Sequence, residues 1–166
     1  VFLHIPKPAS GEETIEIKVA GADAVFSYTG LSMDATDTTG VLHLNVASGI
    51  IGATMADDNS YVDIVFNAKI YGASDLQSPA AYDDFDLSFN TETGGLTSAQ
   101  IIAAKKPDGT PLEGGETVIR VFLNMGGSIT KHDYINIGPK SASSLYDQNG
   151  TALSVEGSGG NIFFHE

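Results

Sequence analysis

The chain has 166 residues, 42% of them hydrophobic, and its 21 acidic and 8 basic side chains give a formal net charge of −13. So acidic a surface repels phosphate backbones and anionic lipids, which argues against nucleic acid or an anionic membrane as a partner. The absence of cysteine excludes disulfides and cysteine-ligated zinc, and no apolar run approaches the ~20 residues of a membrane helix.

The first 46 residues match the last 46, residues 121–166, at a fixed offset of 120 positions and without a gap. Eight positions are identical, and apolar positions and glycines elsewhere coincide in phase. Self-similarity at a fixed period is typical of repeat architectures. The matches include Val1, Phe2 and Leu3 with Val121, Phe122 and Leu123; Ile15 and Ile17 with Ile135 and Ile137; Val25 and Phe26 with Leu145 and Tyr146; Gly30 with Gly150; Met33 with Leu153; Gly40 with Gly160; and Leu42 and Leu44 with Ile162 and Phe164.

The offset predicts a repeat of 120 residues, with residues 1–46 as the C-terminal part of a preceding repeat and residues 47–166 as one complete repeat. The start at Val1 without an initiator methionine fits a piece of a longer protein. Half a repeat would expose its apolar inner face and unpaired strand edges. We therefore expect these to be covered by upstream chain, or by another copy through domain swapping or strand complementation.

Within residues 47–166, short apolar runs predict β-strands. Val62, Ile64 and Phe66, for example, take every second position, which places one face of a strand on a core. Ile101 and Ile102 are adjacent rather than at helical spacing, so that segment is also predicted to be a strand. The predicted strands cover residues 50–55, 61–66, 85–89, 97–105, 119–125, 135–137 and 161–165.

Clusters of glycine, proline, aspartate and asparagine separate these strands, for example at residues 107–109 and 147–150. Such residues favour tight turns. About seven short strands per repeat predict an all-β fold, an antiparallel Greek-key Ig-like β-sandwich.

Several β motifs occur in order along the chain: DNSYVDIVF at residues 58–66, LEGGETVIRVFL at residues 112–123, and SLYD at residues 144–147 followed by Gly150. Together they resemble the tandem Ig-like or cadherin-like repeats of giant bacterial extracellular proteins, such as cell-surface adhesins and motility-associated surface proteins. The resemblance implies an extracellular or cell-surface spacer or adhesive module. Its expected partners are neighbouring repeats, other copies of the chain, or surface glycans or proteins.

Acidic clusters are the main candidates for a binding site, because Ca²⁺ takes six to eight oxygens from carboxylates, amides and carbonyls. The alternative is that they form turns and keep the surface soluble. The spacing of an EF-hand is absent. No nucleophile elbow occurs, and we expect neither an enzyme nor another cofactor. The candidate Ca²⁺ ligands are Asp57, Asp58, Asp63, Asp83, Asp84, Asp147 and Asn149.

Tyr61 and Phe122 are the candidate ligand-binding residues, because both fall on the polar phase of their strands. They would either form an exposed aromatic platform of the kind that binds sugars, or pack under a loop or against a neighbouring repeat, which we expect. The platform belongs to an alternative function, a carbohydrate- or protein-binding jelly roll, similar to a carbohydrate-binding module or a cohesin, formed by all 166 residues.

Overall fold

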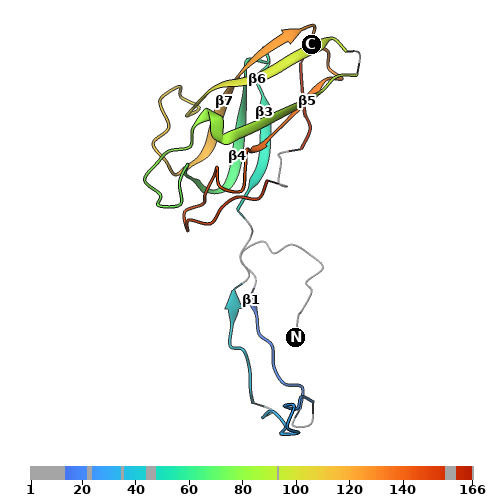
Figure 1. Cartoon of the computed structure of the whole chain (residues 1–166), viewed down its shortest axis with the longest axis vertical. Helices are drawn as coiled ribbons and strands as arrows, with labels where there is room; N and C mark the ends of the chain where they lie inside the picture. The colour runs from blue at the N-terminus through green and yellow to red at the C-terminus, as the bar shows by residue number, and fades with distance from the viewer. Residues whose placement is uncertain are drawn as a thin grey trace. The chain divides into compact units, whose positions relative to one another are not determined.

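The computed structural model describes residues 14–21, 24–34, 36–43, 48–92, 94–155 and 160–165. The chain divides into two compact units, Val1–Ala47 and Ser48–Glu166 (Figure 1). The predicted repeat boundary, between residues 46 and 47, lies one residue before this division. Four of the matched residues, Val1, Phe2, Leu3 and Leu44, lie outside the described part of the chain.

The second unit is built from strands that pair antiparallel in two sheets (Figure 1). One sheet has the strand order β3-β4-β7-β6, and the other has the order β5-β8-β9. The predicted all-β class and antiparallel sheets are confirmed. The elements are β3 (Ile50–Met55), β4 (Tyr61–Ile70), the 3₁₀ turn η1 (Tyr82–Asp84), β5 (Phe85–Asn90), β6 (Leu96–Lys105), β7 (Glu116–Gly127), β8 (Tyr134–Pro139) and β9 (Ile162–Phe163).

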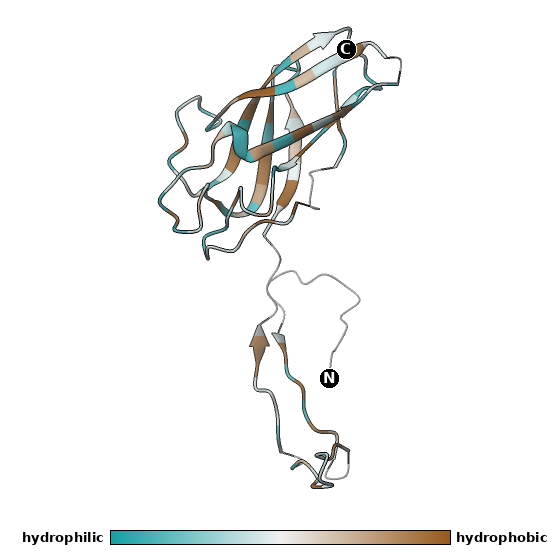
Figure 2. Ribbon diagram, viewed as in Figure 1, coloured by the Kyte–Doolittle hydropathy of each residue, from teal (hydrophilic) through white to brown (hydrophobic). Residues whose placement is uncertain are grey.

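The two sheets of the second unit share one hydrophobic core. Along β4, buried side chains take every second position through Val62, Ile64 and Phe66, as the period of a strand requires. The other sheet contributes Ile135 and Ile137, which are almost fully buried. Figure 2 shows the resulting alternation of hydrophobic and hydrophilic residues along the strands.

A β-bulge accommodates the two adjacent isoleucines of β6. Ile101 pairs with Leu123 and Ala103 pairs with Phe122, so Ile102 is an extra residue in its strand. A bulge of this kind interrupts the regular alternation of the side chains. Ile101 accordingly packs against the core, while Ile102 is exposed. The strand predicted at residues 97–105 is confirmed, and the bulge explains its irregular pattern.

The first unit contains a two-stranded antiparallel sheet of β1 (Thr14–Ile15) and β2 (Leu42–His43). Isolated antiparallel bridges continue the pairing between Lys18 and Thr38 and between Phe26 and Ser32. The described residues of this unit therefore form a long, irregular hairpin, in which residues 14–21 and 24–26 lie against residues 32–34 and 36–43.

Most pairings of the first unit recur in the second unit at an offset of 120 residues. The short sheet and one of the two isolated bridges, Phe26/Ser32, are reproduced in the same register. The corresponding pairs are Thr14/His43 with Tyr134/Phe163, Ile15/Leu42 with Ile135/Ile162, and Phe26/Ser32 with Tyr146/Ala152.

A tight turn is also built in the same way in both units. Gly30 and Gly150 have left-handed φ angles of 84° and 73°, which glycine adopts without steric cost. The same three backbone hydrogen bonds close each turn. In the first unit these are Ser27 N–H to Leu31 O (2.7 Å), Gly30 N–H to Ser27 O (3.0 Å) and Met33 N–H to Val25 O (2.9 Å); in the second they are Asp147 N–H to Thr151 O, Gly150 N–H to Asp147 O and Leu153 N–H to Leu145 O (2.9 Å each).

Replacing Gly150 by alanine should destabilise the second unit more than the same change at Gly109. Both glycines have left-handed φ angles, which cost alanine about 1–2 kcal/mol. A Cβ atom at Gly150 would also lie 2.8 Å from the carbonyl oxygen of Ser74, whereas at Gly109 it would meet nothing within 4 Å. Urea unfolding of both variants measures the difference, and equal losses of stability would contradict the close approach at Gly150.

Candidate functional site

Tyr61 and Phe122, the predicted ligand residues, lie opposite each other on β4 and β7. Their ring centroids are 5.9 Å apart and their planes are tilted by 56°, an arrangement typical of packed aromatic pairs. Both side chains are half-buried. The two rings therefore pack on each other, on the face of the four-stranded sheet that points away from the core.

Arg120 stacks on the Tyr61 ring of this aromatic pair. Its guanidinium carbon lies 3.7 Å from the centroid of the Tyr61 ring, and its Nε and Nη2 atoms each donate a hydrogen bond of 2.7 Å to the carboxylate of Asp63. These hydrogen bonds raise the pKa of Arg120. Stacking and bidentate pairing together fix the orientation of the guanidinium. Asp63, a candidate Ca²⁺ ligand, is thus already paired with a cation of its own sheet.

Lys105 completes the arrangement, with its Nζ atom 5.8 Å from the centroid of the Phe122 ring. We name Tyr61, Asp63, Lys105, Arg120 and Phe122 the aromatic–arginine surface. Each ring has a cation beside it, and cations are attracted to the faces of aromatic rings. The surface is therefore ordered by its own contacts, and a ligand-binding role for its two rings stays a prediction.

Two of the other acidic candidates stabilise turns. Asp58 Oδ1 accepts hydrogen bonds from the hydroxyl (2.6 Å) and the amide (3.0 Å) of Ser60, and these bonds lower the pKa of Asp58. Asp84 Oδ2 accepts a hydrogen bond of 2.7 Å from the amide of Ala81, while burial raises the pKa of Asp84. Both contacts are local, as is usual for aspartate in turns.

Asp147 is a buried carboxylate at the centre of the turn over residues 147–151. Its Oδ1 atom accepts hydrogen bonds from the amides of Asn149 (2.8 Å) and Thr151 (2.9 Å), and its Oδ2 atom accepts one from the Ser48 hydroxyl (2.7 Å). Burial alone would raise the pKa of Asp147, but these donors outweigh it and the pKa is lowered. The carboxylate thereby ties the turn to the first residue of the second unit.

The structure does not bring the candidate Ca²⁺ ligands together. Asp57 and Asp83 are exposed, and Asn149 contributes its backbone amide rather than an oxygen to Asp147. Within the part of the chain that the structure describes, no three histidine, aspartate or glutamate side chains are grouped so that they could hold a metal ion. Calcium binding stays a prediction.

Asp133 is a fully buried carboxylate that the sequence analysis missed. It accepts hydrogen bonds from the amides of Thr130 (2.9 Å) and Glu92 (3.2 Å). Burial would raise the pKa of Asp133, yet these donors outweigh it and the pKa is lowered. The neighbours Lys131 and His132 give the segment the character of an exposed polar turn, so no signal in the sequence marks Asp133 as buried.

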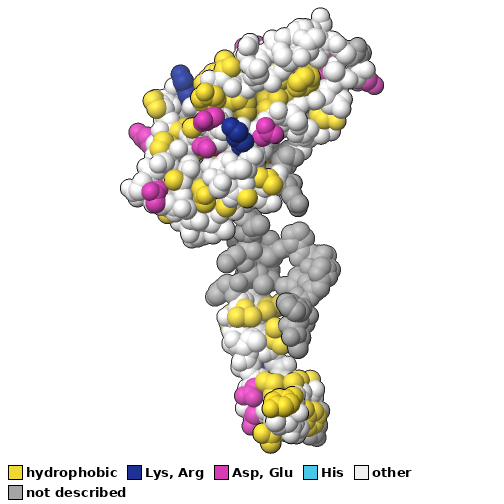
Figure 3. Space-filling model, in the orientation of Figure 1, with side chains coloured by type: hydrophobic (Ala, Val, Ile, Leu, Met, Phe, Trp, Pro, Cys, Tyr) yellow, Lys and Arg dark blue, Asp and Glu magenta, His cyan; other side chains and the backbone are white. Residues whose placement is uncertain are grey.

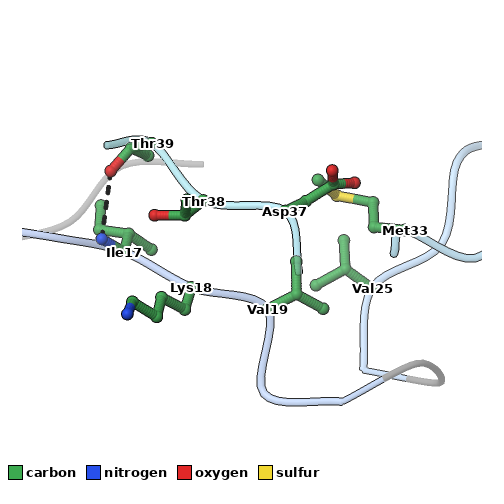
Figure 4. A pocket seen from close by; sticks show the side chains of 8 residues that line it. All are labelled: Ile17, Lys18, Val19, Val25, Met33, Asp37, Thr38 and Thr39. Carbon is green, nitrogen blue, oxygen red and sulfur yellow. Dashed lines mark hydrogen bonds between the residues drawn. The ribbon is translucent and has the colours of Figure 1, made fainter. Parts of the chain in front are cut away.

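The first unit holds an apolar hollow of about 670 Å³. Figure 4 shows Val19, Val25 and Met33 on one side of it and Ile17 on the other. Hydrophobic side chains are visible on the surface of this unit in Figure 3. Contiguous apolar surface, when the patch is large, is typical of interaction sites. The lining residues are Ile17, Lys18, Val19, Val25, Met33, Asp37, Thr38 and Thr39.

No protein-family model matches the chain, and neither a curated protein nor a solved structure matches it. Among the described residues, no helix is both long and apolar enough to cross a bilayer.

Replacing Asp147 by asparagine should remove part of the pH dependence of stability. Because the pKa of Asp147 is lowered in the folded state, its contribution is present above the unfolded pKa of about 3.9 and is lost as the pH falls through the folded value. We expect the variant to be about 1 kcal/mol less stable at pH 7, since hydrogen bonds to a charged acceptor are stronger than to a neutral one. The gap should shrink towards pH 3.

Urea unfolding of both proteins between pH 7 and pH 3 measures this gap. Asp133 is unchanged in the variant, so its contribution cancels from the comparison. A gap that stays constant over the whole range would mean that the charge of Asp147 contributes nothing to the turn.

Proposed function

We propose that this chain is a non-catalytic structural or adhesive repeat module of a secreted or cell-surface bacterial protein, in which similar Ig-like sandwiches follow one another in an array. Residues 1–46 are the C-terminal part of one repeat, and residues 47–166 are the next, complete repeat. The observation that carries this proposal is the recurrence of the same backbone pairings at an offset of 120 residues. Chance alternation of apolar residues would not also reproduce the hydrogen bonds and the left-handed glycines.

The strand order of the second unit supports a Greek-key Ig-like fold. Constant-type Ig sandwiches have strands A, B, E and D in one sheet and C, F and G in the other. If β3 to β9 are taken as A to G, the order β3-β4-β7-β6 becomes A-B-E-D, and the order β5-β8-β9 becomes C-F-G. The chain also changes sheet at the points where an Ig chain does, because β5, β6 and β8 each lie in the opposite sheet from the strand that precedes them.

The partners of the buried and half-buried carboxylates support a structural rather than a catalytic role. Asp63 is paired with Arg120, and Asp133 and Asp147 accept hydrogen bonds mainly from backbone amides. Catalytic groups are usually tuned by burial or neighbouring charges in a cleft that faces a substrate. Repeat modules need no such chemistry, since each unit contacts mainly its neighbours.

The resemblance to tandem repeats of bacterial surface proteins supports a location outside the cell. In such an array the partners are neighbouring repeats and other copies, and an adhesive role adds surface glycans or proteins. The alternative, a jelly roll formed by all 166 residues, is less well supported, because the chain divides into two compact units and the described hydrophobic core belongs to the second unit.

Sequencing the coding DNA on both sides of this chain tests the array. We expect further copies at a spacing of about 120 residues, each keeping the glycines equivalent to Gly30 and Gly40.

Antibody labelling tests the location. Antibodies against residues 48–166 should label intact, unpermeabilised cells of the source organism. A single copy joined to an unrelated catalytic domain, or labelling only after permeabilisation, would contradict the proposal.

A further inference from the structure

Four apolar residues of the first unit are exposed, whereas their equivalents in the second unit are buried. Each residue and its equivalent form a pair at the offset of 120 residues. The backbone pairing around them is the same, so the difference lies in what covers them. The exposed fractions are 39% for Ile17 and 1% for Ile137, 45% for Val25 and 0% for Leu145, 41% for Met33 and 2% for Leu153, and 44% for Leu42 and 5% for Ile162.

In the second unit, the cover comes from the chain that precedes the repeated stretch. We name residues 48–120 the covering segment and residues 121–166 the repeated stretch. Strand β5 of the covering segment pairs along β8, with Leu87 opposite Ile137. Tyr71 exchanges two backbone hydrogen bonds of 2.9 Å with Tyr146. More than half of the buried core side chains, Phe66 among them, also belong to the covering segment.

The hollow of the first unit lies where such a segment would fit. Its walls include Ile17, Val25 and Met33, whose equivalents all belong to the closed core of the second unit. The strand edge that β8 offers to β5 corresponds in the first unit to residues 14–19, and no described strand other than β2 pairs with β1. In the second unit the covering segment packs on the equivalent apolar face and pairs with the equivalent strand edge. A similar segment could therefore do both in the first unit.

Exchange between identical copies of this chain cannot supply the cover. The 166 residues contain two versions of the repeated stretch, at residues 1–46 and 121–166, but only one covering segment among them. If a second copy lent its covering segment to the first unit, its own repeated stretch would lose the same contacts. Swapping therefore moves the exposed face from one place to another without burying it.

We propose that the first unit is the receiving half of a sandwich, and that its occupant is a covering segment of the same design as residues 48–120, joined directly before Val1. The register follows from the offset, since Val1 is aligned with Val121 and Arg120 precedes Val121. Strand pairing along residues 14–19 and apolar side chains in the hollow form the contact. This inference rests on the proposed array, and it names the residues through which one repeat is closed.

Cysteine labelling tests the inference, because the chain has no cysteine of its own. Met33→Cys and Leu153→Cys place a thiol at equivalent positions of the two units. In the native chain, the thiol at position 33 should react with a small reagent on the order of 100-fold faster or more, since a buried thiol reacts only after local opening. Equal rates would overturn the inference, because position 33 would then be covered already.

An extended chain provides the occupant. The covering segment, residues 48–120, is placed before Val1 of the full 166-residue chain, in the register described above. The thiol at position 33 should then slow to within about tenfold of the thiol at position 153. Unchanged fast labelling at position 33, with slow labelling at position 153, would overturn the inference even if flanking DNA encodes further repeats. Slow labelling at position 153 also shows that the second unit of the extended chain is folded.

A matched control separates specific cover from the mere presence of extra chain. Phe85→Asp is introduced only into the added segment, where it places a charge among the side chains that should fill the hollow. We expect the thiol at position 33 to label fast again, while the thiol at position 153 stays slow. If the Phe85→Asp extension slows labelling at position 33 to the same degree as the unmodified extension, the proposed position of the covering segment in the hollow is wrong. A dimer of the native chain with slow labelling at position 33 would also overturn it, because a second copy would then be the cover.

Discussion

The structure depends on burying the apolar face of an irregular hairpin by the strands that precede it in the chain. In the second unit this happens through β5, which pairs with β8, and through side chains such as Phe66 and Ile70 that enter the shared core. Burial of apolar surface is the main driving force for folding. The hairpin of the first unit shares most of this backbone pairing, but among the described residues its equivalent side chains are exposed.

Within each unit, a side chain that accepts hydrogen bonds from backbone amides stabilises the tight turn. Asp147 gathers the amides of its turn, and at the equivalent position Ser27 Oγ accepts a hydrogen bond of 3.1 Å from the amide of Leu31. A hydroxyl thus takes the place of a carboxylate while the backbone path is kept. Side-chain acceptors in turns commonly satisfy backbone amides in this way. The turn is therefore conserved in its geometry between the two units although the residue changes.

The sequence allowed the all-β class and most strand positions to be predicted, because alternation at Val62, Ile64 and Phe66 records which face is buried. It could not reveal the bulge at Ile102, which depends on the register with Leu123 across the sheet. The candidate sites were harder still. Asp63 and Arg120 are 57 positions apart and meet only through strand pairing, and Asp133 is buried by contacts that no local pattern encodes.

The most direct measurement of the repeated scaffold is the detection of hydrogen bonds in solution by scalar couplings between amide nitrogens and carbonyl carbons. Equivalent couplings are predicted from Met33 to Val25 and from Leu153 to Leu145, since each pair is joined by a backbone hydrogen bond of 2.9 Å. Couplings at matching positions in both units would support one scaffold built twice. The account would be contradicted if Leu153 showed a coupling to Leu145 while the amide of Met33 showed a coupling to a residue other than Val25.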